Sequence, residues 1–373
     1  ADSVQQRRPN VVLIMMESMS AEFMKHFGQS ETLTPFLDSL YTRSISFRNF
    51  YSAGIHTNHG LYATLYSFPA MMKRNLMKGS VIPRYSGLPT VLKENGYYNL
   101  FFMTHEGQYD NMNAFFRTNG YDEVFSQEDY PVDKVVNSFG VQDDFLYDYA
   151  IPVLNQRAAT GQPFFATLLS ISNHPPYVIP PFFHPKTSEP EMQIVEYADW
   201  ALRQFFEEAR KQPWFDNTIF VLEGDHGKLV GDAECELPES YNHIPLMIYS
   251  SRIQPEEKTT FGGQVDIQPT ILGLLNIDYL QNNFGVDLLK EERPCMFYTA
   301  DNMVVGRNDT LLYLYNYETQ QELTYDIGNG KLNAVPMDDS FLPLKEYSFS
   351  MLQSAEFLVK HGKTLNSIPF TQQ

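Results

Sequence analysis

Four short apolar segments of this chain each end at a residue that can bind a metal ion or act in catalysis. They are the segments 10–17, 100–105, 164–174 and 218–226. Apolar runs this short, bounded by polar residues, are typical of strands buried on both faces of a parallel sheet. The sequence therefore predicts an α/β fold, with a mostly parallel central sheet sandwiched by helices.

The polar residues at the ends of these strands are expected to lie close together, because ligands collect at the carboxyl ends of parallel strands. The residues concerned are Glu17, His105, His174, Asp225 and His226. Carboxylate and imidazole groups of this kind suit Mn²⁺ or Zn²⁺. The sequence therefore predicts a metal-dependent active site with one divalent ion. We expect Mn²⁺, with Zn²⁺ and Mg²⁺ as alternatives.

A glycine-flanked turn, Gly54 to Gly60, carries a candidate nucleophile. It lies between a predicted strand and a predicted helix, so Thr57 would stand at a helix N-terminus, where unpaired N–H groups favour an anion. A threonine hydroxyl is a weak nucleophile and needs a base or a metal ion to activate it. We therefore predict Thr57 as a candidate nucleophile, beside the candidate metal ligands Glu17, Asp225 and His226.

The composition excludes some classes of function. A formal net charge of −18, from 27 basic and 45 acidic residues, argues against nonspecific nucleic-acid binding. No stretch approaches the roughly 20 apolar residues that span a bilayer, and the first residues lack a signal-peptide pattern. Before any family comparison, an ordinary cytosolic start and a trimmed ectodomain with an upstream anchor are equally compatible with the sequence. Cys235 and Cys295 could form one disulfide, although we favour unpaired cysteines.

Hydrophobic periodicity and turn residues divide the chain further. Helices are predicted to begin at Thr34–Pro35 and to cover 89–94, 195–211 and 267–275, with further strands at 44–51 and 244–249. After Arg293, short strands at 295–300, 311–317 and 321–326 and a helix at 348–359 indicate a small antiparallel sheet with a closing helix. We expect a linker at 1–8, a catalytic domain at 9–292 and a small C-terminal α+β subdomain at 293–373.

Several motifs in order resemble the sulfatase-like branch of the alkaline phosphatase superfamily. The resemblance covers roughly residues 9–290, and the segments that carry it are 9–18, 33–51, 197–202, 215–227 and 265–272. Segment 9–18 is similar to the first strand and metal carboxylate of that family, and 224–227 is similar to its metal-binding Asp-His-Gly. The resemblance implies the family's fold and a metal-dependent reaction.

The nucleophile position distinguishes the chemistry within that branch. True sulfatases carry a Cys or Ser in a pattern that is converted to formylglycine, and Thr57-Asn58-His59-Gly60 lacks both. A threonine here resembles the lipoteichoic acid synthases, phosphoglycerol transferases and phosphoethanolamine transferases. That resemblance implies a covalent intermediate on a metal-bound threonine.

Segments 105–122 and 172–177 are most similar to the phosphoglycerol-transferring group, whose corresponding histidines bind the substrate headgroup. The resemblance thus implies substrate contacts at His105 and His174. The Trp and Arg that hold glycerol phosphate in lipoteichoic acid synthases are not evident, and Asp110 and Asn111 lie near that position. His243 is similar to a recurrent family histidine and is a further substrate-binding candidate.

The expected reaction is a two-step transfer of a phosphoglycerol-type or phosphoethanolamine-type group from an anionic phospholipid headgroup to a glycan or glycerol-phosphate acceptor. His174 or His105 would protonate the leaving oxygen, since histidines commonly move protons at neutral pH. The resemblance also implies an extracytoplasmic site of action at a bacterial membrane, reached through a segment outside this sequence. Lys228 follows the Asp-His-Gly motif and could contact phosphate, although we expect an exposed lysine there.

Two other classes of function stay open from the sequence. A phosphodiesterase or sulfatase-type hydrolase would use the same residues with water as the acceptor. A noncatalytic binding or structural protein would have no reason to keep the predicted metal ligands together with Thr57.

Overall fold

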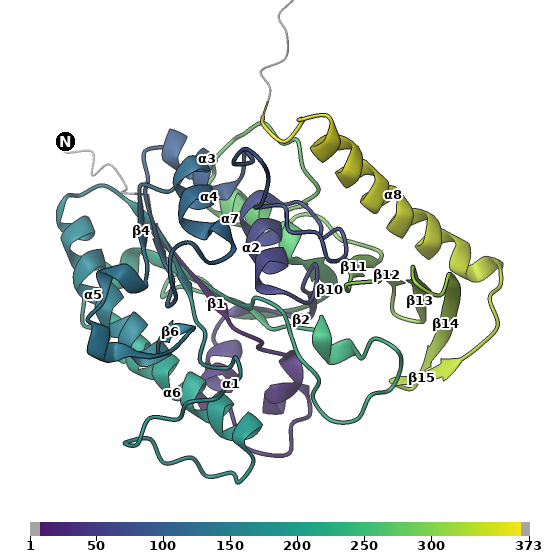
Figure 1. Cartoon of the computed structure of the whole chain (residues 1–373), viewed down its shortest axis with the longest axis horizontal. Coiled ribbons are helices and arrows are strands. Elements are labelled where there is room, and N and C mark those ends of the chain that lie inside the picture. Colours follow the sequence, from purple (N-terminus) through teal and green to yellow (C-terminus); the bar gives the residue numbers. More distant parts are fainter. Residues whose placement is uncertain (1–7, 367–373) are drawn as a thin grey trace, which may run out of the picture.

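The computed structural model describes residues 8–366, which form a large sheet covered by helices and a smaller sheet beside it (Figure 1). The strands of the large sheet are β1 (Asn10–Met16), β2 (Ile45–Tyr51), β3 (Tyr98–Phe102), β4 (Glu123–Phe125), β7 (Phe164–Leu169), β8 (Thr218–Gly224), β9 (Leu246–Tyr249) and β10 (Glu256–Gly263). The helices around it are α1 (Pro35–Tyr41), α2 (Thr57–Tyr66), α3 (Leu88–Glu94), α4 (Met112–Thr118), α5 (Asp143–Ala159), α6 (Pro190–Ala209) and α7 (Ile267–Leu274). Strands β5 (Val135–Asn137) and β6 (Gly140–Val141) form a separate short hairpin.

The strand order of the large sheet is β10-β2-β9-β8-β1-β7-β3-β4. The four predicted apolar segments are β1, β3, β7 and β8, and they are neighbours that run parallel. Strand β9 is antiparallel to both of its neighbours. The predicted fold is therefore confirmed, and the chemistry-bearing strand ends meet at the centre of the sheet.

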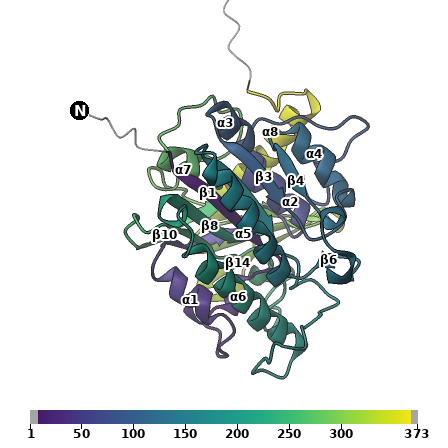
Figure 2. The same cartoon turned by 90° about the vertical axis from the view of Figure 1, so that its left-hand side faces the viewer.

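Helices cover the two faces of the sheet in separate groups. Helices α1, α5 and α6 pack on one face, and α2, α3, α4 and α7 pack on the other. Figure 2 shows α5 and α6 in front of the central strands. All seven residues of β1 are buried, and alternate side chains enter the two cores. Burying one large aliphatic side chain contributes about 1.5–3 kcal/mol. Since β1 buries such side chains in both cores, packing on both faces of the sheet holds it in place.

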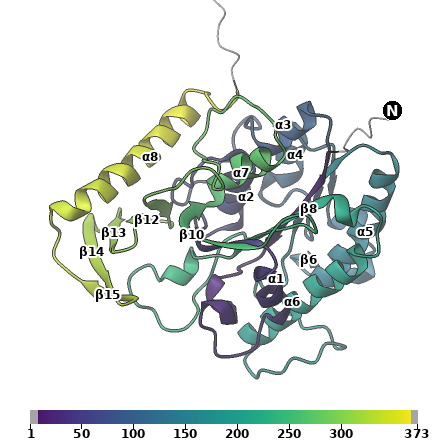
Figure 3. The same ribbon diagram turned by 180° about the vertical axis from the view of Figure 1, so that it is seen from behind.

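The smaller sheet is antiparallel throughout and is closed by the last helix, as predicted. It consists of β11 (Met296–Thr299), β12 (Met303–Arg307), β13 (Leu311–Asn316), β14 (Gln321–Gly328) and β15 (Lys331–Ala334), with α8 (Leu342–Lys360) packed against it. Figure 3 shows this sheet and α8 beyond the β10 edge of the large sheet. A Cβ at Gly306 in β12 would lie 2.4 Å from Ser348 Oγ of α8, so the close packing requires glycine there.

The domain boundary between 292 and 293 stays a prediction, and the expected linker at 1–8 lies almost wholly outside the described residues. Cys235 and Cys295 are free thiols, as favoured above. Within residues 8–366, no helix combines the length and the apolar character that crossing a membrane requires.

Candidate active site

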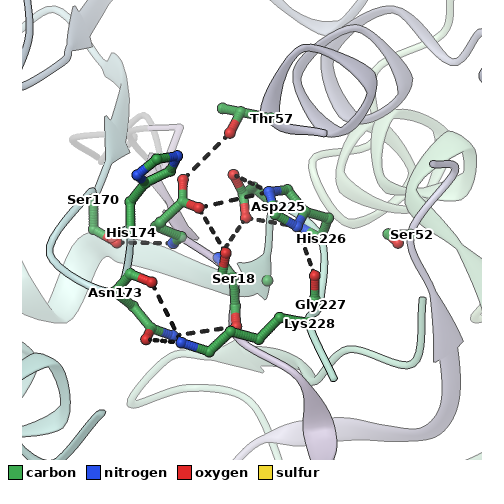
Figure 4. A network of polar contacts seen from close by, with 12 residues as sticks. Ser18, Ser52, Thr57, Ser170, Asn173, His174, Asp225, His226, Gly227 and Lys228 are labelled. Carbon is green, nitrogen blue, oxygen red and sulfur yellow. Dashed lines mark hydrogen bonds and ion pairs between the residues drawn. The ribbon is translucent and has the colours of Figure 1, made fainter. Parts of the chain in front are cut away.

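The carboxyl ends of β1, β7 and β8 align because the strands pair in register. Met15 lies opposite Leu169 of β7 and Glu223 of β8. The next residues of each strand therefore leave the sheet at the same level and bring Glu17 and Asp225 together. Figure 4 shows Asp225 and His226 there, with Thr57 and Ser18 beside them.

Glu17, Asp225 and His226 form a cluster whose candidate ligand atoms all lie within 4.8 Å of one another. His226 Nε2 lies 3.6 Å from Glu17 Oε1 and 3.7 Å from Asp225 Oδ2. Both carboxylates are almost fully buried, and Asp225 Oδ2 has no hydrogen-bond partner within the described part of the chain. A buried, unpartnered carboxylate oxygen beside a second carboxylate fits a divalent cation, and this donor set suits Mn²⁺, Zn²⁺ or Mg²⁺.

The electrostatics of the cluster also fit a cation site. Burial and the neighbouring Glu17 carboxylate raise the pKa of Asp225. Burial by itself lowers the pKa of His226, but the Asp225 and Glu17 carboxylates outweigh burial and raise it overall. Both shifts favour the protonated forms of Asp225 and His226, because a proton on either group compensates the negative charge of the two carboxylates. A bound cation would also compensate the two carboxylates, and it would lower the pKa of both Asp225 and His226 instead of raising it.

Thr57 is the first residue of α2, and its hydroxyl faces the cluster. Thr57 Oγ1 donates to Glu17 Oε2 at 3.3 Å. The start of α2 lies so close to β8 that a Cβ at Gly60 would be 2.2 Å from the Asp225 carbonyl oxygen. Gly60 therefore allows the approach that puts the hydroxyl against the cluster of Glu17, Asp225 and His226.

Two serines hold the carboxylates in place, and the sequence analysis missed both. Ser18 Oγ donates to Glu17 Oε1 at 2.7 Å, and the Ser18 backbone N–H donates to Asp225 Oδ1 at 2.9 Å. Ser18 does so in the left-handed region, with φ 50°. Ser170 Oγ accepts from the Glu17 backbone N–H at 3.0 Å. Serines after apolar runs are too common for this role to be recognised from a sequence.

Gln264, also missed, ties the loop before Thr57 to the end of β8. Its side-chain amide donates to the carbonyl oxygens of Gly224 and Asp225 and accepts from the backbone N–H of Ala53. Gln264 directly follows β10, which is an edge strand of the large sheet. No local pattern links it to residues 53 and 225.

The structure does not bring all the predicted substrate residues into the cluster. His105 is buried, its Nδ1 contacts the Glu106 carbonyl oxygen, and burial lowers its pKa. Asp110 pairs with Lys78 at 2.7 Å. Asn111 donates to the Met77 carbonyl oxygen at 3.2 Å. These contacts give Asp110 and Asn111 a structural task in fixing the 77–78 loop, and their substrate contacts stay predictions.

His174 and His243 differ in their surroundings. His174 lies in the turn after β7, with Nδ1 against the Pro175 carbonyl oxygen and its ring on Phe139. His243 is buried, with Nδ1 bonded to Glu22 and Nε2 bonded to the Arg48 carbonyl oxygen. Neither ring nitrogen of His243 is directed at the cluster, so a substrate role for it stays a prediction.

Lys228 is not the exposed lysine that was expected. Its Nζ donates to Asn173 Oδ1 at 2.6 Å and to the Tyr177 hydroxyl at 3.0 Å. Burial lowers the pKa of Lys228 to about 8, although Glu17 and Glu191 act in the opposite direction. The side chain therefore belongs to the wall of the site (Figure 4).

Comparisons with known proteins agree with this architecture. The sulfatase family model matches residues 9–277. Lipoteichoic acid synthase 2 of Bacillus subtilis is 24% identical over an alignment of 315 residues that covers 76% of this chain and 47% of that protein. Lipoteichoic acid synthase 1 of the same bacterium is 25% identical over an alignment of 350 residues that covers 86% of this chain and 53% of that protein. The chain thus spans about half the length of these relatives.

Solved structures are similar over nearly the whole chain. A protein of the alkaline phosphatase superfamily from Vibrio parahaemolyticus has a TM-score of 0.87 at 28% identity, covering 98% of this chain and 90% of that one. A lipoteichoic acid synthase from Listeria monocytogenes has a TM-score of 0.81 at 21% identity, covering 95% and 93%, and shows the fold alone. With its family model matched over more than half of its length, this chain belongs to the sulfatase family of the alkaline phosphatase superfamily.

Proposed function

We propose that this chain is the catalytic part of a metal-dependent transferase that moves a phosphoglycerol-type group from a phospholipid to an acceptor hydroxyl through a covalent intermediate on Thr57. A phosphoethanolamine-type group is the alternative headgroup. The observation that carries the proposal is the contact of Thr57 Oγ1 with Glu17 at the edge of the cluster. The similarity to proteins named lipoteichoic acid synthases supports the choice of the transferred group.

In this proposal Glu17, Thr57, Asp225 and His226 would hold the divalent ion. When bound, such an ion lowers the pKa of a ligated hydroxyl and neutralises charge on the phosphoryl oxygens. Glu17 accepts the hydrogen bond of Thr57 and so orients its oxygen toward the substrate. Ser18 and Ser170 keep Glu17 in place during the reaction.

Thr57 loses its hydroxyl proton to solvent before the first turnover. Its Oγ then attacks phosphorus in line, the bond from phosphorus to the diacylglycerol oxygen breaks, and Thr57 is released again as the alkoxide at the end of each cycle. His174, or alternatively His105, gives a proton to the leaving oxygen. The acceptor hydroxyl then attacks the phosphothreonyl diester and returns a proton to that histidine, which frees Thr57. The acceptor is a glycan or a glycerol-phosphate chain.

We also propose that the enzyme works at the extracytoplasmic face of a bacterial membrane, to which a segment outside this sequence attaches it. The basis is the family resemblance and the relatives' names. We propose further that residues 9–292 are the catalytic domain and that residues 293–373 are a small C-terminal subdomain.

Acceptor dependence tests the proposal. Purified, Mn²⁺-loaded protein is incubated with phosphatidylglycerol, with and without a glycerol-phosphate acceptor, and diacylglycerol and the extended acceptor are quantified. Thr57→Ala should abolish transfer, because loss of a catalytic nucleophile costs on the order of 10⁶ in rate where measured in a serine enzyme. Thr57→Ser should keep part of the activity, since it keeps the oxygen.

Thr42→Ala, which changes an exposed threonine, is the matched control and should behave like the wild type. Near wild-type turnover by metal-loaded Thr57→Ala would mean that water attacks phosphorus directly. Release of free glycerol phosphate without any dependence on acceptor would likewise turn the assignment into a hydrolase.

A further inference from the structure

Lys228 carries a partly buried positive charge without a carboxylate partner. It lies two residues after His226, and its ammonium group is over the rings of Phe23 and Tyr177, at 5.4 and 4.8 Å from their centroids. Its close hydrogen-bond acceptors are the neutral oxygens of Asn173 and Tyr177. No ion pair found within residues 8–366 includes Lys228.

Two other shielded cations within residues 8–366 are neutralised. Arg293 pairs with Asp266 and Arg307 pairs with Glu239. Removing a charge from water is costly unless an opposite charge compensates it. Neutral acceptors orient the ammonium group of Lys228, and the Glu17 and Glu191 carboxylates act on it electrostatically without forming an ion pair with it within residues 8–366. The site is therefore prepared for an anion that comes from outside the chain.

The position of this charge is fixed relative to the metal-ligand cluster. Asn173, which accepts from Lys228, donates through Nδ2 to the Ser18 carbonyl oxygen at 3.2 Å. Ser18 in turn contacts both Glu17 and Asp225. Figure 4 shows this chain of contacts from the ammonium group to the carboxylates. Lys228 and the cluster thus belong to one rigid rim at the ends of β1, β7 and β8.

We propose that Lys228 is a phosphate-binding residue, which supplies the fixed positive charge for the anionic phosphate of the substrate beside the metal-ligand cluster. Asn173 and Tyr177 are its positioning residues. A lysine ammonium serves phosphate as a point charge, and a phosphodiester carries its negative charge on its two non-bridging oxygens. The inference rests on the proposed function for the identity of the substrate, a phosphodiester, but not for the binding of phosphate.

The test measures phosphate binding apart from turnover. Inorganic phosphate and glycerol 3-phosphate are titrated calorimetrically into Mn²⁺-loaded wild-type protein, Lys228→Met and Lys228→Arg. Because a hydrogen bond to a charged group is lost, Lys228→Met should bind phosphate at least about tenfold more weakly than the wild type. Lys228→Arg should recover most of the affinity, and added salt should weaken wild-type binding more than that of Lys228→Met. Lys211→Met, at an exposed lysine paired only with Glu208, is the matched control.

Manganese content and thermal midpoint should be unchanged in both Lys228 variants, and KM for phosphatidylglycerol should rise in Lys228→Met. Wild-type phosphate affinity in Lys228→Met, or no measurable phosphate binding by the wild type, would overturn the inference. So would a loss in Lys228→Met that comes with loss of manganese, because that result indicates a structural role.

The two proposals fail in different ways. If phosphate binding depends on Lys228 but the wild type transfers nothing from phosphatidylglycerol, the transferase proposal fails and the assignment of Lys228 stands. If the wild type transfers and Lys228→Met binds phosphate and turns over normally, the assignment of Lys228 fails alone.

Discussion

At the residue scale, Asp225 is the side chain on which metal binding should depend most. Its Oδ2 is buried without a hydrogen-bond partner within residues 8–366, whereas Oδ1 is held by backbone N–H groups. We expect elemental analysis to find about one divalent ion per chain and Asp225→Ala to lower that occupancy sharply. Asp216→Ala, at an exposed acidic residue, is the control. Full occupancy and activity in Asp225→Ala would exclude Asp225 from the site.

His243 should make the stability of the fold depend on pH. Burial lowers its pKa, but the Glu22 carboxylate outweighs burial and raises the pKa to about 9. Because the folded pKa exceeds the unfolded value of about 6.5, the pair stabilises the fold fully below pH ~6.5, and this contribution is lost as pH rises to about 9. The shift corresponds to a contribution on the order of 3 kcal/mol.

Urea unfolding at pH 6 and pH 9.5 measures this contribution. The free energy of unfolding should fall between the two pH values in the wild type, and His243→Gln should show a smaller fall. An equal fall in both proteins would show that other groups cause the dependence.

The residues of the cluster could be predicted from sequence, but their supports could not. Glu17 and Asp225 each end an apolar strand, and the rule for parallel sheets brings such ends together. Gln264 and Lys228 act through contacts across loops that are distant in sequence. Those contacts exist only once the strands are in register, so no local pattern reveals them.

At the element scale, the packing of α2 on the end of β8 should be sensitive to one methyl group. In Gly60→Ala the added Cβ would lie 2.2 Å from the Asp225 carbonyl oxygen, which is backbone and cannot move freely. We expect lower thermal stability together with weaker manganese binding, because the shift displaces Asp225 and Thr57.

Gly306→Ala is the matched control, since its Cβ would meet Ser348 at the interface of β12 and α8, away from the cluster. It should lower the thermal midpoint but leave the manganese affinity unchanged. If both variants weaken manganese binding equally, the effect on the site is a general loss of stability.

The elements with a clear signal were predicted, and the others were hidden by specific residues. Helix α6 has an apolar stripe and was predicted at 195–211, whereas in the structure it begins earlier, at Pro190, and ends at Ala209. Helix α5 was missed because Pro152 lies inside it, on its exposed side, and its apolar residues follow no clean period. Helix α8 begins at Leu342 and not at the predicted 348. Pro343 in its first turn was the sequence signal for this earlier start.

At the scale of the whole molecule, the net charge of −18 should oppose contact with anionic lipid. Screening by salt shortens the range of that repulsion to about 8 Å at physiological ionic strength. We expect turnover of this chain on phosphatidylglycerol vesicles to rise as sodium chloride is raised from about 10 to about 150 mM. Turnover of a short-chain, soluble phosphatidylglycerol should not rise in parallel. A fall on vesicles would instead indicate a basic contact surface for the membrane.

The central claim is that Thr57 carries the transferred group, and peptide mass spectrometry tests it most directly. Mn²⁺-loaded protein is incubated with phosphatidylglycerol without acceptor, quenched in acid and digested. The account predicts a phosphoglycerol adduct on the peptide that contains Thr57, absent from Thr57→Ala and lost when an acceptor is added before quenching. Steady release of diacylglycerol with an unmodified Thr57 peptide, or an adduct on another residue, would contradict it.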